Sequence, residues 1–204
     1  MKEITIIDYG MCNLDSVARA VEKCGGRPIV SGNAADVETA AALILPGVGS
    51  FNDAMRELTN RNLDTAIRAQ VNDKKIPFLG ICLGMQLMAT TGHEGGEKGG
   101  LDLIPGEVVR LEPATAAEKI PHVGWNEVHH AGHELFAGIA DATDFYFVHS
   151  FHFRCDTPYI LGRTPFCGGF ISAVGRARCL GVQFHPEKSL AAGQTLLKNF
   201  IHLC

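Results

Sequence analysis

Apolar and polar residues along the first eighty positions repeat with two alternating periods, one typical of strands and one typical of helices. Asn13 is placed to cap a helix and Gly25 to end it. Strands that alternate with helices build a parallel sheet covered on both faces, so the pattern predicts an α/β fold. The predicted elements are strands over residues 3–8, 27–31 and 41–45, an amphipathic helix over 13–24, helical stretches through Val71, and a strand from Ile76.

The second half of the chain is predicted to add an antiparallel portion. From Gly106 onward, short apolar runs are separated by turn residues, and a helix over 189–203 closes the pattern. No internal repeat and no low-complexity linker interrupts the 204 residues. We therefore expect a single domain over residues 1–204 with one well-buried core.

The segment Gly80–Gln86 places one cysteine between two glycines, after an apolar run and before a helix-forming stretch that continues to Ala89. A strand that turns abruptly into a helix leaves no room for side chains two residues before and after the turning residue. Glycine is therefore required at both positions. The pattern predicts that Cys82 is a reactive nucleophile at the amino end of a helix, where unpaired N–H groups favour a negative charge.

A cysteine nucleophile needs a base, and the base needs a group that orients it. Residues 180–187 alternate with the period of a strand, on which His185 and Glu187 would point to the same side, with Pro186 keeping the strand extended. Cys82, His185 and Glu187 are therefore predicted to form a Cys-His-Glu triad. An isolated cysteine is usually a packing residue, but packing requires neither two flanking glycines nor a paired base.

Acyl transfer also requires donors for the oxyanion that develops on the substrate. The N–H of Leu83, directly after the nucleophile, is one candidate. The turn Pro46–Gly49, which follows an apolar strand, is the other, with Val48 and Gly49 as donors, because glycine lets a peptide rotate at little steric cost. A plain tight turn that ends a strand is the alternative for this segment.

Charge and composition exclude several classes of partner. Eighteen Lys and Arg against 22 Asp and Glu give a net charge of −4, which leaves no basic surplus for nucleic acid. No apolar stretch approaches the roughly 20 residues that cross a bilayer, so no membrane partner is expected. Seven cysteines without paired spacing favour a reducing cytoplasm over a disulfide framework.

Two further motifs are predicted to carry no chemistry. His129, His130 and His133 lack a cysteine or carboxylate at ligand spacing, so no metal is expected there. The glycine-rich segment 95–100 lacks the Gly-Lys-Ser/Thr ending of a phosphate loop and is predicted to be a flexible surface loop.

Several blocks of the chain resemble a known family. The elbow together with Phe184–Ser189 resembles the class I (triad) glutamine amidotransferases. More narrowly, four further blocks look like the glutaminase subunits of imidazole glycerol phosphate synthase, from histidine biosynthesis. The resemblance implies a flavodoxin-like α/β fold, glutaminase activity and no cofactor. These four blocks are Ile7–Gly10, Leu45–Phe51, Pro121–Asn126 and Tyr146–Phe151.

The resemblance also implies roles outside the triad. The residues that would line a glutamine pocket are Gly49, Gln86, Ser150 and Phe151, and those that would face a partner are Asn13, Trp125, Tyr146 and Lys188. A strand in the core is the alternative for Ser150 and Phe151, and ordinary core packing is the alternative for Trp125 and Tyr146. The implied partner is a (β/α)8 cyclase in a heterodimer, which uses ammonia to form imidazole glycerol phosphate and an aminoimidazole carboxamide ribotide.

Two places depart from the family pattern. Cys12 stands where the pattern has glycine, and Phe166-Cys167 stands where it has a Tyr-Gly pair. Neither touches the triad.

A paralogous glutaminase that supplies ammonia for amidation of a sugar is also compatible with the sequence. A non-catalytic regulatory module is disfavoured by the intact triad.

Overall fold

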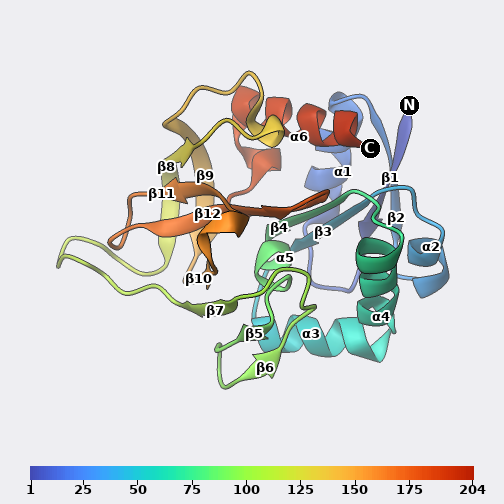
Figure 1. The fold of residues 1–204 in the computed structure, drawn as a ribbon, viewed down its shortest axis with the longest axis horizontal. Helices are drawn as coiled ribbons and strands as arrows, with labels where there is room; N and C mark the ends of the chain where they lie inside the picture. The colour runs from blue at the N-terminus through green and yellow to red at the C-terminus, as the bar shows by residue number, and fades with distance from the viewer.

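The computed structural model describes all residues from Met1 to Cys204, and its elements follow the predicted alternation (Figure 1). The helices are α1 (Leu14–Lys23), α2 (Ala34–Glu38), α3 (Phe51–Asn60), α4 (Leu63–Arg68), α5 (Leu83–Gln86) and α6 (Leu190–Leu203). The strands are β1 (Lys2–Ile7), β2 (Gly26–Ser31), β3 (Leu43–Gly47), β4 (Phe78–Cys82), β5 (Thr91–Gly92), β6 (Lys98–Gly99), β7 (Glu107–Arg110), β8 (His122–His130), β9 (Thr143–His149), β10 (Phe151–Arg154), β11 (Ile160–Thr164), β12 (Phe170–Arg176) and β13 (Cys179–Val182).

Thirteen strands form one hydrogen-bonded sheet. Strands β2, β1, β3, β4 and β13 are parallel neighbours in this order. Beyond β13, the sheet continues through β12, β10 and β7 with antiparallel pairing. Strand β11 branches from β12 and carries the ribbon of β8 and β9. The predicted α/β class, with an antiparallel portion in the second half, is confirmed.

Helices cover both faces of the parallel half (Figure 1). Alternate residues of the buried strands point to opposite faces, so β3 contributes Ile44 to one apolar core and Leu43 and Leu45 to the other. The first core contains α1 and α6, and the second contains α3 and α4. None of the helices combines the length and apolar character that a membrane span requires.

The register of the parallel strands decides what lies at their carboxyl ends. Gly47 of β3 is paired with Cys82 of β4, and Val182 of β13 is paired with Ile81 of β4. The turn after β3, the end of β4 and the segment after β13 therefore leave the sheet side by side. In open parallel sheets, ligands bind at this edge.

The helix after Cys82 is shorter than predicted, since α5 ends at Gln86 rather than continuing to Ala89. The carbonyl oxygens of Leu87 and Met88 accept hydrogen bonds from Leu101 and Leu103, at 2.8 and 2.9 Å. The chain leaves the α-helical pattern here because the N–H groups of Met88 and Ala89 donate only three residues back, to Met85 and Gln86, and the contact with Leu101 and Leu103 holds it in that path. This contact joins segments about fifteen residues apart and has no local signal in the sequence.

Two other local predictions hold only in part. Segment 95–100 is not simply a flexible loop, because β6 pairs with β5 in register Thr91 with Gly99. Asn13 occupies the N-cap position of α1, but its side chain makes no capping hydrogen bond. The predicted bounds of the helix over 189–203 agree with α6 to within one residue.

Candidate active site

Cys82 stands at a sharp turn between β4 and α5, with φ of 54° and ψ of −111°. A non-glycine residue in this region costs about 1–3 kcal/mol, which the surrounding packing must offset. A Cβ at Gly80 would lie 2.7 Å from the carbonyl oxygen of Gly84, and a Cβ at Gly84 would overlap the carbonyl oxygen of Leu45. Both glycines are thus required by the close approach of the backbone, as the steric argument from the sequence predicted.

The side chains of His185 and Glu187 are buried and adjacent, with Nδ1 of the imidazole 2.8 Å from Oε1 of the carboxylate. The predicted strand over 180–187 is wrong beyond Val182, where β13 ends. Pro186 instead begins a 3-10 turn over Pro186–Lys188, and this turn brings the carboxylate back to the ring. The two side chains therefore meet, but through a turn and not through the alternation of a strand.

Strand β9 holds the backbone of His185 in place. The N–H of His185 donates to the carbonyl oxygen of Tyr146 at 2.9 Å, and the hydroxyl of Ser189 donates to the carbonyl oxygen of His185 at 2.6 Å. The same hydroxyl accepts from the N–H of Tyr146 at 3.0 Å. Ser189 had no predicted role, and its only signal was its place at the end of the block Phe184–Ser189.

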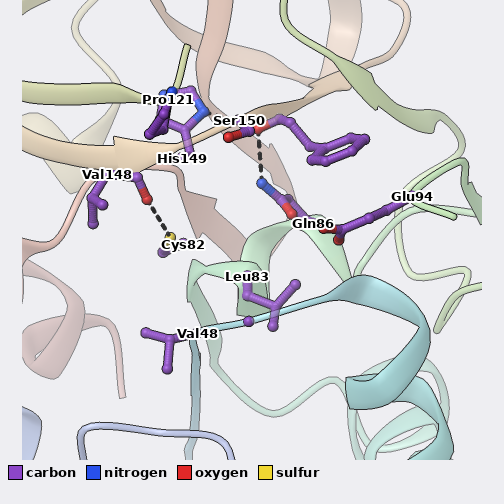
Figure 2. A pocket seen from close by; sticks show the side chains of 11 residues that line it. Val48, Cys82, Leu83, Gln86, Glu94, Pro121, Val148, His149 and Ser150 are labelled. Atoms are coloured by element: carbon purple, nitrogen blue, oxygen red, sulfur yellow. Dashed lines mark hydrogen bonds between the residues drawn. The ribbon is translucent and has the colours of Figure 1, made fainter.

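The electrostatics of this pair favour a protonated imidazole. Burial lowers the pKa of His185, whereas Cys82 and Glu187 raise it, and the resulting pKa is about 9. Nε2 of His185 is buried without a hydrogen-bond partner. The sulfur of Cys82 lies 3.8 Å from the carbonyl oxygen of Val148, a contact that Figure 2 marks with a dashed line, and 3.7 Å from Nε2 of Gln183. A proton is therefore held beside the thiol without being committed to another acceptor.

A pocket of about 270 Å³ opens beside Cys82 (Figure 2). This volume lies just under the usual range of about 300–1,000 Å³ for ligand sites, so the pocket suits a compact ligand. The residues that line it are Val48, Gly49, Cys82, Leu83, Gln86, Glu94, Pro121, Val148, His149, Ser150 and Phe151.

The structure brings together all four residues expected in the glutamine pocket, namely Gly49, Gln86, Ser150 and Phe151. The side-chain amide of Gln86 donates to the carbonyl oxygen of Phe151 at 2.8 Å and to Oε1 of Gln183 at 3.1 Å. Both protons of this NH₂ group are used, because an amide nitrogen has only two. Oε1 of Gln86 is therefore the atom left to face a ligand.

Sequence reasoning missed four of the lining residues, Glu94, Pro121, Val148 and His149. Glu94 is fixed at the pocket by α3, because its Oε2 accepts from the N–H of Phe51 at 2.8 Å. The side-chain amide of Asn52 donates to the carbonyl oxygen of Glu94 at 2.7 Å. These contacts join residues more than forty positions apart, so no local pattern could have revealed them.

The turn Pro46–Gly49 borders the pocket in a form that we call closed, because the N–H of Val48 is bonded within the protein. The N–H of Val48 donates to the carbonyl oxygen of Met11 at 2.9 Å. Gly49 has φ of 102°, and a Cβ there would lie 2.8 Å from Cε of Met11. Leu83 is the first residue of α5, where a backbone N–H has no acceptor within the helix. The two predicted groups of oxyanion donors thus lie on the same pocket, but the N–H of Val48 is occupied.

The two departures from the family pattern differ in backbone conformation. Cys12 does not have a positive φ, and its sulfur lies 3.6 Å from the carbonyl oxygen of Pro46. Burial raises the pKa of the Cys12 thiol to about 11. Cys167 has φ of 53°, in the left-handed region where glycine is favoured. Cysteine therefore replaces the glycine of the family pattern without backbone strain at position 12 and with backbone strain at position 167.

The outer face of the β8–β9 ribbon exposes apolar side chains. Trp125 pairs across the ribbon with Tyr146, and Val123 with Val148. Trp125 is 48% exposed and Val123 is 57% exposed. Nζ of Lys188 lies 5.8 Å from the centre of the Tyr146 ring. Trp125 is therefore not a core residue, and the alternative of ordinary core packing does not hold for it.

Comparison with known proteins identifies the family of this chain. The family model of class I glutamine amidotransferases matches residues 5–204. The chain is 46% identical to the imidazole glycerol phosphate synthase subunit HisH of Moorella thermoacetica over 202 residues, which cover 98% of this chain and 94% of that protein. It is 44% identical to subunit HisH 1 of Campylobacter jejuni over 201 residues, which cover 98% of this chain and 100% of that protein.

Solved structures share the fold at lower identity. A crystal structure of a glutamine amidotransferase superimposes with a TM-score of 0.77 at 18% identity, covering 98% of this chain and 97% of that chain. PurLQS from Thermotoga maritima superimposes with a TM-score of 0.76 at 16% identity, covering 98% of both chains. With the family match over nearly its whole length and close relatives of one kind, the chain belongs to the class I glutamine amidotransferases and, among them, to the glutaminase subunits of imidazole glycerol phosphate synthase.

Proposed function

We propose that Cys82, His185 and Glu187 hydrolyse glutamine to glutamate and ammonia within one amidotransferase domain over residues 1–204. The observation that supports this most strongly is the strained elbow at Cys82, which opens on the pocket with the His185–Glu187 pair beside it. Strained residues of this kind persist only where the surrounding structure holds them in place, and they cluster at active sites. Seven free thiols fit a reducing compartment, and we place the protein in the cytoplasm.

The reaction uses the proton held on His185. The sulfur of Cys82, as thiolate, forms a C–S bond with the amide carbon of glutamine, and the carbonyl electrons move to its oxygen. When the oxyanion collapses, the C–N bond breaks and Nε2–H of His185 gives its proton to the departing ammonia. Neutral His185 then takes a proton from water, whose oxygen displaces the sulfur and releases glutamate. Glu187 orients the imidazole and stabilises its charged form throughout.

The pocket fits glutamine by its polar groups. Gly49, Ser150 and Phe151 form its walls, and Oε1 of Gln86 is left to accept a hydrogen bond from the ligand. The carboxylate of Glu94 adds a negative group to the lining, which is suited to the α-ammonium group of an amino acid.

Oxyanion stabilisation is incomplete while the turn Pro46–Gly49 is closed. The N–H of Leu83 supplies one donor, and a peptide of the turn supplies the other from Val48 or Gly49. The bond from Val48 to Met11 must break before the Val48 N–H can reach the substrate. The resting chain is therefore a weak glutaminase, and a partner raises its turnover by shifting the turn to the open form.

The ammonia requires an acceptor on a second chain. Free ammonia near neutral pH becomes ammonium and loses its nucleophilicity, so transfer within a complex preserves it. We infer that the partner is a (β/α)8 cyclase that forms imidazole glycerol phosphate and an aminoimidazole carboxamide ribotide. It docks on the exposed face of the β8–β9 ribbon, where Trp125, Tyr146 and Lys188 gather, and reaches Asn13 at the start of α1.

The decisive experiment separates the two half-reactions in the reconstituted complex. Cys82→Ala is expected to abolish glutamine-dependent product formation, while added ammonium salt still supports the cyclase at the wild-type rate. Retained glutamine turnover in this variant would contradict the mechanism. Failure of the cyclase substrate to stimulate wild-type glutamine hydrolysis would favour a different acceptor, such as the synthase of an amidated sugar.

A further inference from the structure

Three hydrogen-bonded side chains lie in a row on the inner face of the β8–β9 ribbon. We call this row of Asn126, His122 and His149 the file. His122 and His149 are register partners across the two strands, and Nδ1 of His122 lies 3.1 Å from Nε2 of His149. On one side, Nδ2 of Asn126 lies 3.3 Å from Nε2 of His122. On the other side, Nδ1 of His149 lies 2.8 Å from the carbonyl oxygen of Phe151, which lines the pocket.

The chemistry of these groups gives every hydrogen bond in the file one direction. A carbonyl oxygen can only accept, so Nδ1 of His149 carries a proton and its Nε2 is an acceptor. Nδ1 of His122 must then donate to His149, which makes Nε2 of His122 an acceptor as well. Asn126 supplies the matching donor, because its Oδ1 already accepts from the N–H of Glu127 at 2.9 Å and its Nδ2 therefore faces the ring.

Both imidazoles are held in their neutral forms by their surroundings. His122 is 5% exposed and His149 is 6% exposed. The His122 ring stacks on Phe166 with centroids 4.1 Å apart, and the His149 ring meets the ring of Phe170 with centroids 4.8 Å apart. Burial lowers the pKa of His122 to about 4 and the pKa of His149 to about 3. A neutral ring has one donor and one acceptor, which is what the file requires.

The file ends on the groups that shape the pocket. The carbonyl oxygen of Phe151 accepts from both His149 and Gln86, each at 2.8 Å. Gln86 donates onward to Oε1 of Gln183, whose Nε2 lies 3.7 Å from the sulfur of Cys82. Figure 2 shows His149 beside Pro121, with the dashed bond of Gln86 reaching the neighbouring backbone. Hydrogen bonds therefore run without interruption from Asn126 on β8 to the thiol.

We propose that Asn126, His122 and His149 are positioning residues that fix the carbonyl of Phe151 and the amide of Gln86 for glutamine binding. The proposal rests on the glutaminase function proposed above. The file begins one residue from Trp125, on the opposite face of the same strand. A partner that moves β8 against β9 would lengthen the His122–His149 bond, and the pocket would respond through Phe151.

The first test is spectroscopic and needs no substrate. Nitrogen-15 correlation spectra of the full wild-type chain are expected to show both His122 and His149 as neutral Nδ1–H tautomers at pH 7. His122→Phe keeps an aromatic ring but removes the donor to His149. His149 is expected to keep its Nδ1–H form, because the carbonyl oxygen of Phe151 can only accept, while its Nε2 resonance shifts as the hydrogen bond from His122 is lost. A wild-type Nε2–H tautomer at either ring would overturn the proposal.

The second test measures how the pocket binds. Labelling of Cys82 by a diazo-ketone analogue of glutamine gives a half-saturating concentration and a maximal rate. His122→Phe is expected to raise the half-saturating concentration about tenfold with a smaller change in maximal rate, since a buried acceptor is left unpaired. His122→Asn places an amide N–H near the position of Nδ1 and is expected to restore most of the binding.

The same substitution elsewhere on β8 serves as the control. His129 is half-exposed and pairs with Glu127 and Asp141 at the surface, so His129→Phe is expected to label like the wild type. Labelling of His122→Phe at the wild-type half-saturating concentration would overturn the proposal, as would an Asn variant no better than Phe. A wild type that is not labelled at Cys82 would contradict the glutaminase function, and the tautomers alone would then decide the positioning role.

Discussion

Gly47 and Cys82 are register partners on the parallel strands β3 and β4. Both strands end at this pair, so the turn Pro46–Gly49 and the nucleophile leave the sheet together. A change in the turn therefore acts directly on the space beside the sulfur. The bond between the Val48 N–H and the Met11 carbonyl oxygen, at 2.9 Å, holds the turn in its closed form.

This arrangement predicts a latent glutaminase. The chain alone is expected to hydrolyse glutamine weakly, with a modest rise on adding the cyclase and a further rise with the cyclase's nucleotide substrate. Recovery of one oxyanion donor corresponds to about 10²–10³ in turnover number, with less effect on KM. Steady-state kinetics under the three conditions test this. A lone chain that works at the rate of the loaded complex would show that the closed turn has no regulatory effect.

The pKa of His185 predicts a stability that depends on pH. Burial lowers this pKa, whereas Cys82 and Glu187 raise it to about 9. Below about pH 6.5, both the folded and the unfolded chain carry the proton. Between about pH 6.5 and 9, only the folded chain does, so the free energy of unfolding is expected to fall by up to about 1.4 kcal/mol per pH unit as pH rises.

Glu187→Gln tests the origin of that shift. Without the carboxylate at 2.8 Å, the pKa of His185 is expected to move down from about 9, because only Cys82 then opposes the effect of burial. Titration of the imidazole by NMR measures this directly, and urea unfolding at several pH values should show a weaker decline in the free energy of unfolding above about pH 6.5. An unchanged His185 titration in the variant would contradict the role assigned to Glu187.

Trp125→Ala tests the docking face. The side chain is 48% exposed, so its loss is expected to leave the melting temperature nearly unchanged. Loss of a central aromatic anchor typically weakens an interface by about 2 kcal/mol, or about 30-fold in Kd. Calorimetric titration with the cyclase measures the change. Val30→Ala is the matched control, since Val30 is 46% exposed on the edge strand β2 at the far end of the sheet. Equal weakening by both variants would argue against this face.

Cys167→Gly tests backbone strain at the second departure from the family pattern. Cys167 has φ of 53°, so glycine is expected to stabilise the fold by about 1 kcal/mol, despite its greater freedom in the unfolded chain. Cys12→Gly is the matched control, because Cys12 has no positive φ and its thiol contacts the carbonyl oxygen of Pro46. Chemical denaturation should therefore show opposite signs for the two variants. A loss of stability at Cys167 would refute the strain.

The elbow and the main elements could be predicted from the sequence, because they depend on local sterics and on the periodicity of apolar residues. Glycines two residues before and after Cys82 are needed because the backbone itself comes within contact distance, and this requirement is visible in seven consecutive residues. The alternation of strands and helices likewise depends on neighbours within one or two turns. For that reason, the parallel half of the sheet and helix α6 agree with the predicted ranges to within two residues.

Only the tertiary structure decided how the site is completed. His185 reaches Glu187 through a 3-10 turn that strand β9 supports, Glu94 enters the pocket through α3, and Met11 holds Val48. The file from Asn126 to Phe151 depends on the register of β8 with β9. Each of these contacts depends on how separate segments pack against one another, and a pattern that repeats every two to four residues carries no information about such packing. The sequence alone determined the chemical groups at the site, and the packing of distant segments determined their distances and directions.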